Sequence, residues 1–375
     1  MKRGSMDRFF WFLFVLFVPF STLSAQNTPA PQLQPRSAEP AKAPSSTASV
    51  PADRQIQLDV QVTDKSGAPV RGLQQQDFTI LDDKRPQNIL SFQSVDSAAA
   101  SASDPPVEVV LVVDAVNAGF QSVTYERSEL KKFLLQNGGK LALPTSLIVF
   151  SDTGTEIQKD SSRDGNALAA LYDQYETGLR IVNRSQGFWG AAERFDLSLK
   201  TLTNFVEHEK TRPGRKLMVW FSPGWPLLSG PRIELTSKQE QHFFDLVVSA
   251  SNDLRQARIT LYSIDPLGLA DAGGSRIVYY KEFLKGVTSA NRVLPANLSL
   301  QVLAVQSGGR VLNSSNDLTS EIAHCVSDGD AFYVLSFQAA RADRANEYHA
   351  IAITVDKPGL TARARTGYYA QPYAP

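Results

Sequence analysis

Cysteine is almost absent from this sequence: its 375 residues include one, Cys325. A single cysteine cannot form an intramolecular disulfide, so the fold must be stabilised by a hydrophobic core large enough to do so alone. Histidine is also scarce, and no two of the four histidines have the i, i+4 spacing that binds zinc on a helix. Phosphate-binding glycine loops, dinucleotide fingerprints and the Gly-x-Ser-x-Gly motif of hydrolases are missing too. No familiar catalytic motif is left.

The chain also lacks an excess of charge of either sign. It has 38 basic and 38 acidic side chains, and 35 and 37 remain when residues 1–25 are removed. A nearly neutral protein gives no electrostatic reason to expect nucleic acid or an anionic membrane as a partner. Local basic clusters at Arg212–Lys216 and at Arg363 and Arg365 are expected on exposed strand or loop faces.

Residues 1–25 have the composition of a cleavable signal peptide. Basic side chains precede an apolar run from Phe9 to Phe20, and small residues end the segment at Ala25. The alternative is a membrane anchor, but a span needs about 20 apolar residues and this run is shorter. We expect cleavage before Gln26 without lipid attachment, because no cysteine stands there. The protein would then be secreted or periplasmic, and would meet the membrane only transiently.

The next part of the chain alternates between linkers and one small β unit. Residues 26–53 are rich in Pro, Ala, Ser and Gln, and too poor in apolar side chains to offset the entropy of ordering, so they are expected to be a disordered linker. Residues 54–97 contain three short runs typical of strands, too few for independent stability. Residues 98–106 are predicted to be a second linker.

From residue 107 to residue 338 the pattern changes to strands alternating with helices. Continuous apolar runs, typical of parallel strands buried on both faces, recur at 107–113, 146–150, 217–221 and 259–264. Helical stretches are predicted at 125–136, 167–175, 191–209, 237–254, 298–306 and 320–326, and further strands at 311 and 331–337. This alternation predicts an α/β domain with a doubly wound, mostly parallel sheet.

Residues 339–375 are predicted to form a C-terminal β extension. Apolar residues alternate with polar ones from Tyr348 to Val355, and Lys357–Gly359 is a turn signal before a second strand. We expect this extension to pair with a sheet edge, with the first β unit as one candidate.

Several motifs in order along residues 54–372 resemble the von Willebrand factor A (VWA) fold, in particular the bacterial group called VWFA-related proteins, common in acidobacteria. The motifs are Val60–Asp64 with Asp77-Phe78, the strand that ends in Asp114, Arg212–Lys216, Trp220–Trp225 and Arg363–Tyr369. The resemblance implies a VWA-like, Rossmann-like sheet. It implies no particular activity, because the group has no defined biochemical role.

The resemblance also implies a place for a metal-ion-dependent adhesion site. Ligand-binding VWA domains carry Asp-x-Ser-x-Ser after the first strand, and this chain has Asp114-Ala115-Val116-Asn117-Ala118. Ser222-Pro223-Gly224 stands where a Ser-Asp-Gly turn is usual, and Gly187–Gly190 stands loosely where a Gly-Gly-Thr loop is usual. Mg²⁺ requires oxygen ligands, and Asp114 is the only matching residue. We expect the site to be degenerate, with no metal and no cofactor.

Polar and aromatic residues at the carboxyl ends of the strands are the candidate binding residues. In an open α/β sheet, ligands bind at this crest, where we expect Asp114, Asn117, Ser222 and Trp225. Trp225 is either an exposed anchor or a cap on the core. The leading hypothesis is an exported, non-enzymatic protein-interaction module whose partner is a protein or a cell-envelope component. The alternatives are a hydrolase with an unrecognised site on the crest and a structural envelope component.

Overall fold

The structure is a computed structural model that describes residues 54–97, 106–118, 120–151, 154–176, 187–228, 234–266 and 279–372. The predicted signal peptide, the linker 26–53 and all of the linker 98–106 except Pro106 lie outside the described residues. Within these ranges, no helix is both long and apolar enough to cross a membrane.

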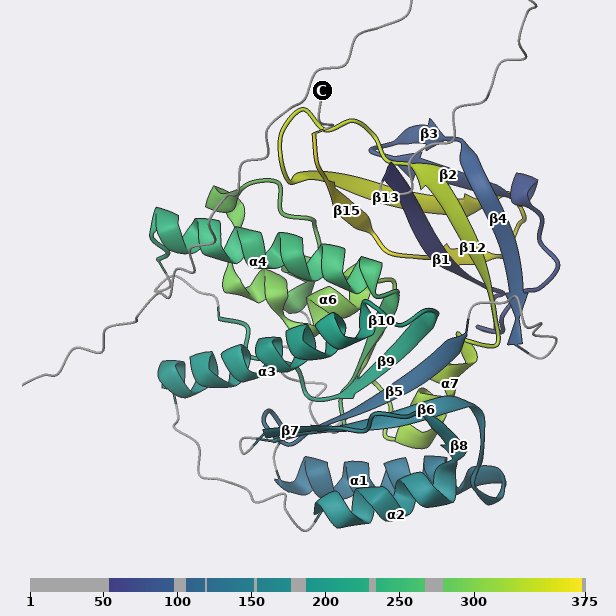
Figure 1. Ribbon diagram of the computed structural model, residues 1–375, viewed down its shortest axis with the longest axis vertical. Helices are drawn as coiled ribbons and strands as arrows, with labels where there is room; N and C mark the ends of the chain where they lie inside the picture. The colour runs from purple at the N-terminus through teal and green to yellow at the C-terminus, as the bar shows by residue number, and fades with distance from the viewer. Residues whose placement is uncertain are drawn as a thin grey trace, which may run out of the picture. The chain divides into compact units, whose positions relative to one another are not determined.

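A mostly parallel sheet forms the centre of the α/β domain (Figure 1). Its strands are β5 (Val107–Asp114), β6 (Lys140–Ser151), β7 (Gly154–Ile157), β8 (Ser162–Asp164), β9 (Arg215–Phe221), β10 (Ile259–Ile264) and β11 (Val311–Leu312). They lie in the order β11-β10-β9-β5-β6-β7, with β8 pairing β6, and only β7 and β8 are antiparallel to a neighbour. Six strands taken in chain order thus lie as 3-2-1-4-5-6, the doubly wound order. The predicted fold class is confirmed.

Helices cover both faces of this sheet (Figure 1). They are α1 (Phe120–Leu135), α2 (Gly165–Glu176), α3 (Gly187–Glu209), α4 (Ser237–Gln256), α6 (Leu300–Gln306) and α7 (Leu318–Ser327). Alternate side chains of β5 point to opposite faces: Val109 and Leu111 pack with α1, α2 and α7, whereas Val110 and Val112 pack with α3, α4 and α6. Each face therefore has its own apolar core.

Eight further strands form a β-sandwich beside the α/β domain (Figure 1). One sheet has the order β14-β1-β12-β4, and the other β15-β13-β2-β3. Their bounds are β1 (Gln55–Thr63), β2 (Phe78–Asp82), β3 (Arg85–Gln87), β4 (Ile89–Asp96), β12 (Ala331–Gln338), β13 (Glu347–Val355), β14 (Thr361–Arg363) and β15 (Gly367–Ala370). Both sheets contribute to one shared hydrophobic core.

The C-terminal β extension pairs with the first β unit, as one of the expectations had it. Strand β13 pairs with β2, and β14 pairs with β1, both antiparallel. Strand β12, however, lies between β1 and β4, although the sequence placed it in the parallel α/β domain of residues 107–338. Its assignment to the α/β sheet was therefore wrong. The reason is that β12 is buried on both faces, by the sandwich core through Tyr333 and Leu335 and by an α/β core through Phe332 and Val334, which gives it the apolar run of a parallel strand.

A buried group of charged residues joins the sandwich to the α/β domain. Asp328 is 1% exposed, pairs with Arg363 of β14 and accepts a hydrogen bond of 2.6 Å from the Tyr262 hydroxyl of β10. Burial alone would raise the pKa of Asp328, but Arg363, the Tyr262 hydroxyl, Arg310 and Arg215 together outweigh burial and lower it. Arg215 donates to the Asp328 carbonyl oxygen at 2.9 Å.

Three basic side chains expected on exposed faces are instead buried. Arg215 and Lys216 are each 1% exposed, and Arg365 is 9% exposed. The expectation was wrong for Arg215 and Lys216 because β9 is a central strand of the sheet: Arg215 reaches Gln61 of β1, and Lys216 Nζ donates to the Arg212 carbonyl oxygen at 2.6 Å. Arg365 lies against α4, where it donates to the Ser251 carbonyl oxygen. Arg215 also lies 4.5 Å from the centre of the Phe332 ring of β12.

Candidate functional site

The crest of the sheet was the predicted binding region, and its centre is the point where the strand order reverses. Strands β5 and β9 are neighbours there, yet β5 is followed by α1 on one face and β9 by α4 on the other. Such a switch point leaves room for a ligand beyond the carboxyl ends of the strands. Asp114 ends β5, and Ser222 follows the last residue of β9.

Asp114 is fully buried, and donors of the protein itself occupy both of its carboxylate oxygens. Oδ1 accepts hydrogen bonds from the backbone N–H groups of Val116 (2.9 Å) and Asn117 (2.8 Å). Oδ2 accepts from Asn117 Nδ2 (2.8 Å) and Trp220 Nε1 (2.9 Å). Burial raises the pKa of Asp114, while these hydrogen bonds act in the opposite direction. The carboxylate is therefore a local cap for the end of β5.

These residues do not fit the magnesium site that the resemblance implies. Val116 and Ala118 offer no side-chain oxygen, and the turn after β9 offers no carboxylate. To bind a cation, Asp114 would have to give up hydrogen bonds that hold Asn117 and Trp220. The degenerate site therefore remains our expectation.

The turn after β9 is closed by a helix from the other end of the domain. Gly224 has a φ of 103°, and a Cβ there would lie 1.8 Å from Gln301 Nε2, so the position admits only glycine while Gln301 of α6 packs over it. Gln301 Nε2 donates to the Pro223 carbonyl oxygen at 3.3 Å. The cavity beside Ser222 is about 10 Å³, the space of one water molecule.

The structure also shows whether Trp225 is exposed or buried. Trp225 is 2% exposed, and its ring meets the Trp220 ring edge to face, with centres 5.1 Å apart. The interpretation of Trp225 as an exposed anchor is therefore wrong, and it caps the core. Asp114 and Ser222 are buried as well, which leaves Asn117 as the half-buried member of the predicted set.

One buried acid beside the crest did not emerge from the sequence. Glu126 of α1 is 0% exposed, and neither carboxylate oxygen has a hydrogen-bond partner among the described residues. Burial raises the pKa of Glu126 well above its ordinary value, and the charge of Asp114 raises it further. A helical period could have revealed it, because Glu126 is spaced three residues from Val123 and four from Leu130, both of which are buried.

The exposed aromatic surface lies instead at the start of α3. Trp189 is 80% exposed and Phe188 is 51% exposed, and their rings meet edge to face with centres 5.5 Å apart. A helix that leads into a parallel strand runs antiparallel to it, so α3, which precedes β9, begins at the carboxyl edge of the sheet. The aromatic pair Phe188–Trp189 therefore lies at the same edge as the crest. The sequence had singled out the Gly187–Gly190 segment only as a loose counterpart of a metal loop.

Comparison with known proteins gives a likeness of fold. No protein-family model matches the chain, and no curated protein matches it. Similar solved structures include the SpRpn10 VWA domain, with 14% identity and a TM-score of 0.27 over 59% of this chain and 94% of that one. The pilus adhesin SpaC of Lactobacillus rhamnosus GG, in its open conformation, has 11% identity and a TM-score of 0.36 over 82% of this chain and 48% of the adhesin.

Proposed function

We propose that the chain is an exported, non-enzymatic protein-interaction module with a VWA-like α/β domain, and that it contacts its partner through the aromatic pair Phe188–Trp189. The partner would be a protein or another component of the cell envelope. The observation that carries the proposal is the exposure of these two large aromatic rings at the carboxyl edge of the sheet.

Large aromatic rings that stay in water leave apolar area that a partner can bury. A tryptophan buries more apolar area than most side chains, and Trp, Tyr and Phe are enriched in the centres of protein interfaces. Among the described residues Trp189 is the most exposed large apolar side chain, and Phe188 is the second most exposed. Because the pair is placed on a helix of 23 residues, little ordering entropy would be lost when a partner covers it.

The inaccessible carboxyl groups at the crest support the non-enzymatic part of the proposal. Asp114 is held by four hydrogen bonds and Glu126 has no accessible surface, so neither carboxyl group can reach a substrate as the structure stands. Asn117 is fixed by Asp114 and by Ser198 of α3, to whose hydroxyl oxygen its Nδ2 donates at 2.8 Å. These contacts fix α3 against the end of β5.

Trp189→Ala is expected to weaken partner binding by at least about 30-fold, the effect of losing about 2 kcal/mol at a central interface aromatic. The free energy of unfolding should change by less than about 0.5 kcal/mol, because an exposed side chain contributes little to the fold. The measurement is quantitative capture from a native envelope fraction, followed by titration of the captured component against both proteins.

Leu135→Ala is the matched control. Leu135 is 46% exposed at the end of α1, and because α1 follows β5 this end lies at the amino edge of the sheet. The control should capture the same components as the wild type. Equal capture by Trp189→Ala, or equal loss in both variants, would contradict the assigned surface.

Export rests on a separate prediction, that the mature chain begins at Gln26. The basic start, the short apolar run and Ala25 support it. N-terminal sequencing of the protein from a bacterial periplasm or culture medium should return Gln26. A chain that starts at Met1 and remains in the membrane fraction would show an anchor instead.

A further inference from the structure

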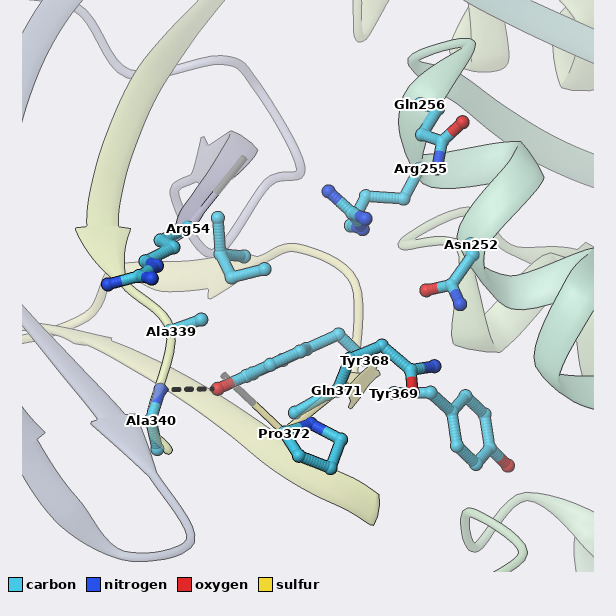
Figure 2. Close-up of a pocket in the computed structure, with 12 residues that line it drawn as sticks. Arg54, Asn252, Arg255, Gln256, Ala339, Ala340, Tyr368, Tyr369, Gln371 and Pro372 are labelled. Atoms are coloured by element: carbon cyan, nitrogen blue, oxygen red, sulfur yellow. Dashed lines mark hydrogen bonds between the residues drawn. The ribbon is translucent and has the colours of Figure 1, made fainter. Parts of the chain in front are cut away.

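A cavity of about 430 Å³ lies between the end of α4 and the β-sandwich, at the amino edge of the sheet and therefore far from the aromatic pair (Figure 2). Asn252, Arg255 and Gln256 of α4 form one wall. The opposite wall comes from the start of β1, from the residues after β12 and from the end of β15, including Arg54 and Tyr368. A volume of this size is typical of sites for small molecules.

Polar groups without partners face each other in this cavity. The guanidinium of Arg255 has no hydrogen bond or ion pair within the part of the chain that the structure describes, and its Nε is buried. Asn252 Oδ1 is also buried without a partner. In Figure 2 both side chains extend from α4 into the space between the helix and the sandwich. Buried donors and acceptors are rarely left unpaired, so each such group calls for a ligand or solvent.

A second cation, Arg365, lies near Arg255. Arg365 is 9% exposed, donates to the Ser251 carbonyl oxygen at 3.4 Å, and has no carboxylate within ion-pair distance in the described ranges. Burial and the neighbouring Arg255 guanidinium lower the pKa of Arg365 to about 9 against the opposite effect of Asp59, and Arg365 is still charged at neutral pH. Asp59 is itself paired with Arg258, and the end of α4 contributes only about half a negative charge, so the two guanidiniums leave a net positive charge here.

We propose that this cavity binds a small hydroxylated organic anion, with a carboxylate or phosphate group on Arg255 and a ligand hydroxyl on Asn252 Oδ1. A planar guanidinium matches both kinds of oxyanion through paired N–H groups. The charge of Arg365 adds to the attraction without direct contact. Pro372, which is exposed, supplies apolar surface for the carbon frame of the ligand. The site is independent of the aromatic pair, so the two proposals can fail separately.

The test is thermal unfolding of the purified chain with glucuronate, inorganic phosphate or neutral glucose, at an ionic strength held constant with sodium chloride. Glucuronate, phosphate or both should raise the melting temperature along a saturating curve, and glucose should not. A response to glucuronate alone identifies a carboxylate site, and a response to phosphate alone identifies a phosphate site. No saturating response to either anion would overturn the proposal.

Arg255→Gln should lower the affinity for the anion that binds the wild type at least tenfold. Without ligand, its melting temperature should be no lower than that of the wild type, because the substitution removes a charge that has no partner. Lys238→Gln removes the same charge from the exposed first turn of α4 and should leave the titration unchanged. An equal response in wild type and Arg255→Gln would place the anion elsewhere and refute the assignment.

Discussion

Replacing Trp225 with alanine is expected to lower the free energy of unfolding by about 3–5 kcal/mol. The side chain is 2% exposed and packs in the core on the α3, α4 and α6 face of the sheet. Its removal would leave a cavity next to Trp220, whose Nε1 holds Asp114, so the damage should reach the end of β5. Chemical denaturation followed by far-ultraviolet circular dichroism measures the loss.

Two variants separate this effect from the mere loss of a tryptophan. Trp225→Phe should cost far less than alanine, because phenylalanine fills most of the space and the buried Nε1 of Trp225 has no partner to lose. Trp189→Ala removes a side chain that is 80% exposed and should leave stability almost unchanged. A small effect of Trp225→Ala, similar to that of Trp189→Ala, would show that Trp225 is not part of the core.

The strands of the parallel sheet could be predicted because their signal is local. Continuous apolar runs mark β5, β9 and β10, whose residues are buried on both faces by helices. The same signal misplaced β12, since an antiparallel strand wedged between two cores has the same composition as a parallel one. Only the pairing of β12 with β1 and β4 distinguishes the two cases, and pairing is not written in local sequence.

The residues at the crest could be predicted, but their exposure could not. The switch point follows from the order of strands and helices, and it correctly brings Asp114 next to Ser222. What covers them comes from afar: Trp220 bonds Asp114 across 106 positions of sequence, and Gln301 reaches Pro223 across 78. The aromatic pair was missed as a surface because an exposed and a buried tryptophan look alike in sequence.

Glu126→Gln is expected to remove a pH dependence of stability that the buried acid creates. The pKa of Glu126 is raised well above 4.5 in the folded chain, so between pH 4.5 and that raised value the folded state holds a proton that the unfolded state has lost. Stability must therefore fall as pH rises through this window, by up to about 1.4 kcal/mol per pH unit. Glutamine has a similar shape and cannot ionise. The free energy of unfolding of the variant should equal or fall below that of the wild type at pH 4.5 and exceed it at pH 7.5.

Glu321→Gln provides the comparison that identifies the source of the slope. Burial, with the nearby Asp265 and Asp317, raises the pKa of Glu321 to about 7, so its contribution has the same sign but ends near that pH. Denaturation midpoints should be measured at several pH values from 4.5 to 8.5. Below about pH 7, the stability of Glu321→Gln should fall less steeply with rising pH than that of the wild type. The contribution of Glu126 has the same sign, because burial and the charge of Asp114 raise its pKa against the smaller opposite effect of Arg127. Equal slopes for Glu126→Gln and the wild type would mean that Glu126 is ionised in the fold, with a partner that holds its charge.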